Sequence, residues 1–353
     1  MFDGERVRKG YLRLEGDALA EVCDGDPPRG TQGGLIISGF VNAHTHLGDS
    51  FAYPAPRISM DDLVAPPGGY KHRVLGSATA ETKTNGMLQS LSIMSLSGTT
   101  VFSDFREEGL QGLMMLRGLL RPEHPRAILL GRPAAEDVLP GEVDRILEAS
   151  EGIGMSSVTD CPKDLLKRLA DSARSKGKLF SIHLSEGVRE DVDQVLALRP
   201  DFVIHATNAT NDDLITLAEA KVPVVVCPRS NEFFGNKVDI PRMLAAGVDV
   251  GLGTDNGMIC RPDMFEEVKA AFRVSASMGN ISALDVVLMA TAQGRKILKA
   301  DGNTTPPVEK ERDFTVVKVP GKDPLRELVT TVEAMDVLAV VRGGKVRRPA
   351  SWR

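Results

Sequence analysis

The feature that most constrains the fold of this chain is a regular alternation of short apolar segments with amphipathic ones, from about residue 35 onward. Apolar segments separated by helical ones are typical of a parallel sheet whose two faces are covered by helices. The expected strands are residues 35–43, 99–104, 127–131, 154–159, 179–185, 202–207, 222–227 and 248–254. Eight such units predict a closed (β/α)8 barrel of the TIM type, an α/β fold.

The segments between these strands carry apolar residues at helical spacing. Residues 164–176 place Leu165, Leu166, Leu169 and Ala173 on one face. The other expected helices are residues 80–96, 107–120, 142–150, 190–198, 212–220, 238–246, 263–277 and 283–299. An open doubly wound sheet is the competing architecture, but neither GxGxxG nor GxxxxGKS/T opens any helix. The closed barrel is therefore the favoured prediction.

The two ends of the chain differ in character from the middle. The segments that alternate β-branched and polar side chains between turns are residues 7–22, 314–319 and 337–346. This pattern is typical of antiparallel strands. Because the barrel lies between them, the sequence predicts a small β-sandwich domain built from residues 1–34 and 305–353, with the barrel formed by residues 35–304.

Charge and composition argue against several classes of protein. Lysine and arginine number 43 against 48 acidic residues, a net charge of −5, so a basic surface for nucleic acid or an acidic membrane is not expected. The four cysteines form no CxxC pair, which argues against a zinc ribbon or thioredoxin-type site. No apolar run approaches the roughly 20 residues of a membrane helix. We expect a cytoplasmic protein that binds a small molecule, and a homo-oligomer that buries Trp352.

Most of the histidines fall at the ends of predicted strands. Four of the six histidines follow the first, fifth and sixth strands, and Asp255 follows the eighth; the four are His44, His46, His183 and His205. The carboxyl ends of barrel strands meet at one mouth, where active sites lie. A lone buried histidine is more often a core residue, and Asp255 within Asp-Asn-Gly could belong to a turn. Five such residues at four strand ends instead favour a site for Zn²⁺ or Fe²⁺.

Five ordered segments resemble a known family. They are SGFVNAHTHLGDS (38–50), IHLSE (182–186), VIHAT (203–207), VCPRSN (226–231) and LGTDNG (252–257). The sequence is similar to the amidohydrolase superfamily of metal-dependent hydrolases, in particular its nucleobase-deaminase and chlorohydrolase branch. The resemblance covers essentially the whole chain, and it implies the barrel fold and a metal-activated water.

The resemblance also implies a role for each matching residue. His44, His46, His183 and Asp255 would hold the metal, and Asp255 would also take a proton from the attacking water. His205 would lie beside the metal and donate a hydrogen bond to the water or to the oxyanion. Glu186, three residues after His183, would shuttle a proton to a ring nitrogen. A glutamate at the start of the next helix is the alternative interpretation of Glu186.

The number of metal ions can be argued from the lysines. Two-metal members of this superfamily use a bridging carboxylated lysine on the fourth strand. No lysine occurs between Lys83 and Lys163, so we expect one divalent ion, Zn²⁺ in preference to Fe²⁺. Asp160 and Cys161, close to the expected fourth strand, leave a two-metal site open.

Candidate substrate contacts follow several strands. They are Arg106, Arg132, Arg229 and Asn231. The planar guanidinium group suits a carboxylate or phosphate, although each arginine could equally form a surface salt bridge. The sequence predicts a metal-dependent hydrolase of non-peptide C–N bonds, most readily a deaminase of a small amino-substituted purine- or pyrimidine-like heterocycle. The alternatives are a cyclic amide hydrolase or chlorohydrolase on the same site, and a catalytically silent metal-binding relative.

Overall fold

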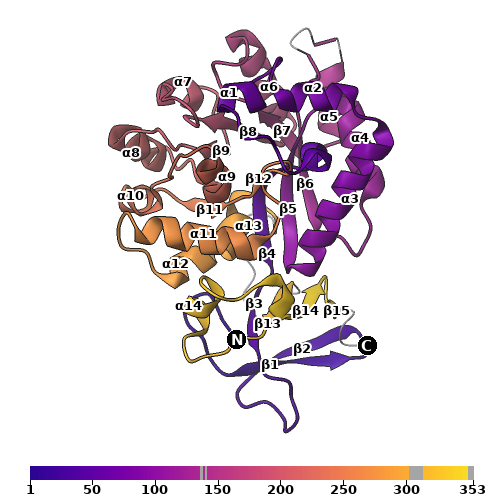
Figure 1. Cartoon of the computed structure of the whole chain (residues 1–353), viewed down its shortest axis with the longest axis vertical. Coiled ribbons are helices and arrows are strands. Elements are labelled where there is room, and N and C mark those ends of the chain that lie inside the picture. The colour runs from indigo at the N-terminus through magenta and orange to yellow at the C-terminus, as the bar shows by residue number, and fades with distance from the viewer. Residues whose placement is uncertain (136–137, 140, 302–312, 349–353) are drawn as a thin grey trace.

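A closed parallel barrel forms the body of the protein. The computed structural model describes residues 1–135, 138–139, 141–301 and 313–348 (Figure 1). The barrel strands in chain order are β4 (Phe40–His46), β5 (Thr99–Arg106), β6 (Arg126–Gly131), β7 (Gly152–Met155), β8 (Leu179–Leu184), β9 (Phe202–His205), β10 (Val224–Val226) and β11 (Val250–Leu252). Each strand pairs with the next, and the short β12 (Asp255–Asn256) returns to β4. The predicted barrel is confirmed.

The barrel closes through a tight set of bonds between its last and first strands. Asp255 pairs with Thr45 in parallel register. The amide of Thr254 donates to the carbonyl of His44 at 3.0 Å and to Oδ1 of Asn42 at 3.0 Å, and Asn42 Nδ2 donates to Oγ1 of Thr254 at 2.8 Å. Closure therefore fixes the eighth unit directly against the two histidines of the first strand.

Helices cover the outside of the barrel (Figure 1). They are α3 (Ala80–Leu96), α4 (Gly109–Leu119), α5 (Glu142–Glu148), α6 (Lys163–Ser175), α7 (Val192–Leu196), α8 (Asn211–Glu219), α10 (Ile240–Ala245), α11 (Met264–Ala276), α12 (Ala283–Leu288) and α13 (Gly294–Ile297), with a π-helical segment, η2 (Met289–Gln293), between the last two. The expected apolar face of α6 is buried, including Leu165 and Leu169. No helix in the described part of the chain is long and apolar enough to cross a bilayer.

Four short helices of the barrel were not predicted from the sequence. They are η1 (Leu47–Ala52), α1 (Met60–Val64), α2 (Tyr70–Ser77) and α9 (Pro228–Phe233). The first three follow β4, and α9 follows β10, so all four lie after the carboxyl ends of barrel strands. They consequently contribute to the mouth of the barrel.

The boundaries of two predicted strands differ from the observed ones in a way that neighbouring residues explain. Residues 35–43 form two strands, because β3 (Leu35–Ser38) pairs with the other sheet and only β4 belongs to the barrel. Gly39 separates them, and a Cβ there would lie 2.2 Å from the side chain of Thr100. The expected strand 154–159 is β7, two residues earlier and shorter, because Ser157 and Asp160 form a turn.

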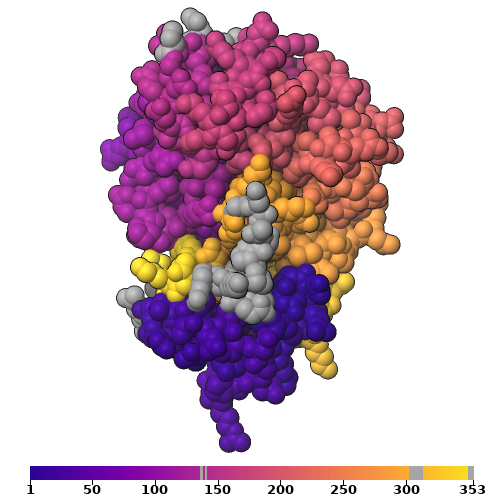
Figure 2. All heavy atoms as spheres, turned by 180° about the vertical axis from the view of Figure 1, so that it is seen from behind, coloured from indigo at the N-terminus to yellow at the C-terminus, as the bar shows by residue number. Residues whose placement is uncertain are grey.

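Both ends of the chain build a second sheet, as expected. Its order is β1 (Gly10–Glu15), β2 (Ala18–Asp24), β15 (Lys345–Arg347), β14 (Val337–Arg342), β13 (Phe314–Val317) and β3. The described pairings in it are antiparallel. Between β13 and β14 lie α14 (Pro324–Leu328) and η4 (Ala334–Asp336). Figure 2 shows N-terminal and C-terminal residues gathered at the same end of the molecule. Trp352 lies outside the described residues.

The contact of the eighth unit with the first strand leaves no room for a side chain at Gly253. A Cβ there would lie 2.7–2.9 Å from Cβ, N and O of His44. We expect Gly253→Ala to lower the free energy of unfolding by about 1–3 kcal/mol and to weaken metal binding, because His44 must move. Urea unfolding and a metal titration measure the two effects. Gly118→Ala in α4, where nothing lies within 4 Å, is the control and should be neutral or slightly stabilising.

Candidate functional site

The candidate site lies at the mouth of the barrel and takes its side chains from four strands. At or next to the carboxyl ends of these strands lie His44, His46, His183, His205 and Asp255. The pairing of β12 with β4 puts Asp255 beside Thr45, between the first two histidines. The pairing of β8 with β9 puts His183 opposite Ile204, so its ring lies next to that of His205, with ring centroids 5.3 Å apart.

These side chains approach closely enough to hold one ion. One ligand atom from each of His44, His183, His205 and Asp255 lies within 4.8 Å of the others. The Nε2 atoms of His44 and His46 lie 3.3 and 3.6 Å from Oδ1 of Asp255. Imidazole nitrogens together with a carboxylate oxygen form a donor set typical of zinc. The structure thus brings three of the predicted ligands, His44, His183 and Asp255, together with His205. The fourth predicted ligand, His46, approaches Asp255 but is not one of these four residues.

Two of the imidazoles are oriented by bonds at their far nitrogen. Nδ1 of His183 lies 2.8 Å from the carbonyl oxygen of Met155. Nδ1 of His46 lies 2.8 Å from Oε1 of Glu107. A ring that donates from Nδ1 keeps the lone pair of Nε2 free for a metal. Both rings are therefore held in the tautomer that a metal site needs.

The surroundings of His44 and His205 indicate whether a metal ion fits this site. Both ring nitrogens of His44 and of His205 are buried without a hydrogen bond of good geometry in the described part of the chain. Buried polar atoms are rarely left unpaired in this way. Burial also lowers the pKa of all four imidazoles, that of His46 to about 4, so they are in the neutral form that binds metals. The residues present fit a divalent metal ion.

A buried network of charges supports His46 from behind. Lys71, on α2, places Nζ 2.6 Å from Oε1 of Glu107 and donates to Oδ1 of Asn256 at 2.8 Å. Nη2 of Arg106 lies 3.3 Å from Oε2 of the same glutamate. Burial alone would raise the pKa of Glu107, but Lys71 and His46 hold it well below its usual range. Glu107 therefore stays charged and keeps its bond to His46.

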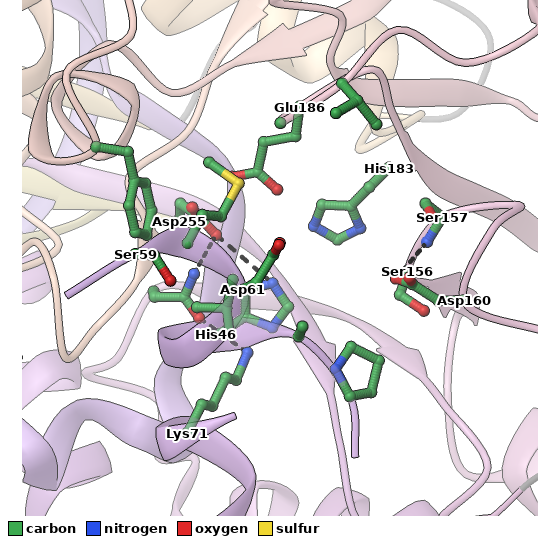
Figure 3. Close-up of a pocket in the computed structure, with 18 of the residues that line it drawn as sticks. His46, Ser59, Asp61, Lys71, Ser156, Ser157, Asp160, His183, Glu186 and Asp255 are labelled. Atoms are coloured by element: carbon green, nitrogen blue, oxygen red, sulfur yellow. Dashed lines mark hydrogen bonds and ion pairs between the residues drawn. The ribbon is translucent and has the colours of Figure 1, made fainter. Parts of the chain in front are cut away.

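A cavity of 720 Å³ opens over the cluster (Figure 3). His46, Lys71, His183, Glu186 and Asp255 line its polar part, and the close-up shows the side chains of His46, His183 and Glu186 around its centre. Its apolar part is formed by Ile58, Met60, Val64, Val188, Phe233 and Phe234. This size and mixture are typical of a site for a small organic molecule.

One of the predicted substrate residues lines this cavity. Arg132, directly after β6, lies in its wall. Arg106 is 1% exposed and belongs to the charge network. Arg229 donates to the carbonyl of Arg261 and lies 3.6 Å from Glu267, so it ties α9 to α11. Asn231 is fully buried on α9 and does not line the cavity. The structure therefore does not place Arg106, Arg229 or Asn231 at the candidate substrate site.

The backbone is strained at two residues of the site. His205 has a φ of 74° and Asp255 a φ of 62°, in the left-handed region that non-glycine residues seldom adopt. Oγ of Ser230 donates to Oδ2 of Asp255 at 2.5 Å and Nδ2 of Asn256 donates to Oδ1 at 3.0 Å. These bonds hold the carboxylate in place despite the strain, a combination that is common at functional sites.

Comparison with known proteins agrees with this geometry. The sequence pattern of the amidohydrolase family matches residues 35–347. The chain belongs to the amidohydrolase family. This amidohydrolase is 32% identical to an uncharacterized protein of Methanocaldococcus jannaschii, over 94% of this chain and 93% of that protein. It is 27% identical to a 5-methylthioadenosine/S-adenosylhomocysteine deaminase of Caldanaerobacter subterraneus, over 88% of this chain and 81% of the deaminase.

A solved structure shows the same fold. The crystal structure of the atrazine chlorohydrolase of Arthrobacter aurescens, complexed with zinc, matches with a TM-score of 0.75 at 17% identity, covering 99% of this chain and 94% of that one. At this identity the likeness concerns the fold. The family match confirms the predicted superfamily and makes the protein a hydrolase.

Two residues of the amidohydrolase site were missed from the sequence. Glu107 lies three residues after the end of the expected strand 99–104, so its position near a strand end was a usable signal. Lys71 offered none, because α2 is short and polar and was not predicted to be a helix. Its ion pair joins residues 36 positions apart, which no local pattern reveals.

We expect the charge on Glu107 to set how tightly His46 binds a metal. Glu107→Gln keeps the shape and an oxygen acceptor but removes the charge, so affinity for Zn²⁺ should fall by about ten- to a hundredfold. Competition with a chromophoric chelator measures this. The control is Glu108→Gln, the next carboxylate, which pairs with Lys83 instead. Equal affinity in both variants would contradict the role of Glu107.

Proposed function

We propose that this protein is a hydrolytic deaminase of a small amino-substituted nitrogen heterocycle, of purine or pyrimidine type. The observation that carries the proposal is the position of Glu186. Its Oε2 lies 3.4 Å from Nε2 of His205, and its carboxyl group shares the cavity with His183 and Asp255. A carboxyl group there can deliver a proton to a ring nitrogen while the adjacent carbon is attacked. The 27% identity to a deaminase over most of its length supports the same reaction class.

The pKa values of two carboxyl groups in the cavity, those of Glu186 and Asp255, are shifted in opposite directions. Burial and the charge of Asp255 raise the pKa of Glu186 well above its usual range. Burial would also raise the pKa of Asp255, but the imidazoles of His44 and His205 hold it well below its usual range. Such a difference supports a division of labour in which Glu186 donates a proton and Asp255 accepts one.

The residues of the site then have the following tasks in the proposed reaction. His44, His46, His183 and Asp255 would hold a divalent ion, which when bound supplies a water that is nucleophilic near neutral pH. Asp255 accepts the proton of the attacking water. His205 donates a hydrogen bond to the oxygen that gains charge at the attacked carbon. Glu186 protonates the ring nitrogen, and the proton that Asp255 took from the water passes to the departing amino group, which leaves as ammonia. Glu186 regains a proton from the hydroxyl group left on the attacked carbon as that group becomes a carbonyl.

Arg132 is the proposed substrate-binding residue among the predicted arginines. It lies in the cavity wall, and its guanidinium group suits an oxygen-rich part of a substrate. Phe233 and Phe234, on the apolar side, offer surface for a flat ring. Both features support a small molecule as the partner.

We expect one equivalent of Zn²⁺ per chain after mild chelation. The fourth barrel strand, β7, carries no lysine that could be carboxylated to bridge a second ion. Asp160 lines the cavity but is not part of the cluster of ligand atoms. Metal analysis by mass spectrometry on protein of known concentration measures the ratio. Two tightly bound equivalents would contradict a single-ion site, and iron in place of zinc would correct the identity of the metal.

We expect wild-type protein to release ammonia from at least one member of a panel of aminopurines and aminopyrimidines. Glu186→Gln should lower kcat by about 10²–10⁴-fold because the proton donor is lost, while bound metal is unchanged. An enzyme-coupled ammonia assay measures the rates. Asp61→Asn is the control. Asp61 lines the same cavity, but it is exposed and has no part in the proposed proton transfers.

The same panel separates the alternatives. Ring opening of cyclic amides, or chloride release from chloro-heterocycles, without ammonia from any amine would reject deamination and retain the hydrolase. Absence of turnover by metal-loaded protein on the whole panel would favour the catalytically silent relative. Unchanged kcat in Glu186→Gln would overturn the role given to that carboxyl group.

A further inference from the structure

A second cavity, of 290 Å³, lies where the barrel meets the six-stranded sheet. Its walls come from the end of α3, the segment before β6, and strands β14 and β15. Because α3 ends at Leu96 and β5 begins at Thr99, this part of α3 lies at the amino-terminal rim of the barrel. The cavity, which we call the junction cavity, is therefore at the opposite end from the mouth.

The unusual feature of the junction cavity is Arg342. This side chain is only 9% exposed. Its Nη1 makes a long hydrogen bond of 3.4 Å to Oγ of Ser95, whereas Nε and Nη2 have no hydrogen-bond partner in the described part of the chain. A buried guanidinium group is normally paired, since an unpaired buried charge is strongly unfavourable. The charge of Arg342 is thus only weakly compensated within the described part of the chain.

The surroundings of Arg342 do not neutralise its charge. Arg347 lines the same cavity, and burial followed by the charge of Arg347 lowers the pKa of Arg342 to about 10, so it remains charged at neutral pH. Glu123 is the one acidic residue among the described residues that line the cavity. The nearby Asp313 is already engaged, with Arg295 and with the amide of Gly343. The positive charge is therefore in excess, and an anion would be attracted.

The rest of the lining combines three apolar side chains with Ser92, Ser95, His124 and Arg348. Leu96, Val337 and Val340 line the cavity beside the arginines, and Leu96 is 61% exposed. The volume of 290 Å³ is close to the lower end of small-molecule cavities, about 300 Å³, and exceeds what one inorganic ion needs. The lining thus suits a molecule with one charged end and an apolar body.

We propose that the junction cavity binds a small organic anion, whose phosphate or carboxylate group pairs with Arg342 and Arg347. The oxygens of either group match the planar fork of a guanidinium group. The apolar body of the ligand contacts Leu96, Val337 and Val340. Bound there, the ligand touches both the barrel and the six-stranded sheet, and it does not compete with a substrate at the mouth. The proposal is independent of the reaction proposed above.

Calorimetric titration of the full chain tests this proposal, with phenyl phosphate, benzoate and inorganic phosphate as the probes at constant ionic strength. We expect saturable binding of one equivalent of phenyl phosphate or benzoate, weaker binding of inorganic phosphate, and a preference that identifies which anionic group the site takes. Arg342→Met should weaken binding by about tenfold or more, and Arg347→Gln by less. Arg13→Met, in β1 and paired with Glu21, is the matched control and should bind as wild type does.

Thermal unfolding separates a ligand-binding arginine from a structural one. In buffer without the probes, Arg342→Met should unfold at the same temperature as wild type or higher, because methionine removes a buried unpaired charge. Phenyl phosphate or benzoate should raise the unfolding temperature of wild type but not of this variant. A lower unfolding temperature for the variant in probe-free buffer, equal binding by both proteins, or no saturable binding to wild type would overturn the proposal.

Discussion

The pairing of β12 with β4 is the contact on which the site depends. It closes the barrel, and it places Asp255 beside Thr45, between the two histidines of the first strand. The main-chain bond from Thr254 to His44 and the close approach of Gly253 leave no freedom at this junction. A barrel with the same strands but a looser closure would keep its hydrophobic interior. Its ligand atoms, however, would no longer lie close enough together to hold one ion.

The sequence was sufficient to predict the barrel and the cluster because both follow from short-range patterns. Strand ends can be recognised from apolar runs, and parallel strands in a barrel bring those ends to one mouth. His44, His46 and Asp255 could therefore be predicted to meet without knowledge of any contact. The boundaries were less predictable, because the break at Gly39 depends on Thr100 from another strand.

The arginines that were predicted to bind substrate show what short-range patterns do not predict. Arg106, Arg132 and Arg229 all follow barrel strands, and nothing in their local sequence distinguishes them. Arg229 is held by Glu267, which lies in another helix, and Arg106 by its neighbour Glu107, which Lys71 also binds from 36 positions away. The packing of α2 and α11 decides which arginine lines the cavity and which is buried in a structural role. The local sequence pattern does not encode this packing.

Buried charge is used differently at the two ends of the barrel. At the mouth, Lys71 and Arg106 neutralise Glu107, so every member of that network has a partner and the network can fix His46 rigidly. At the other end, Arg342 is buried with two donors unused. Since an unpaired buried charge is unfavourable unless something compensates it, the anion that we propose to bind there would stabilise the folded chain at this end of the barrel.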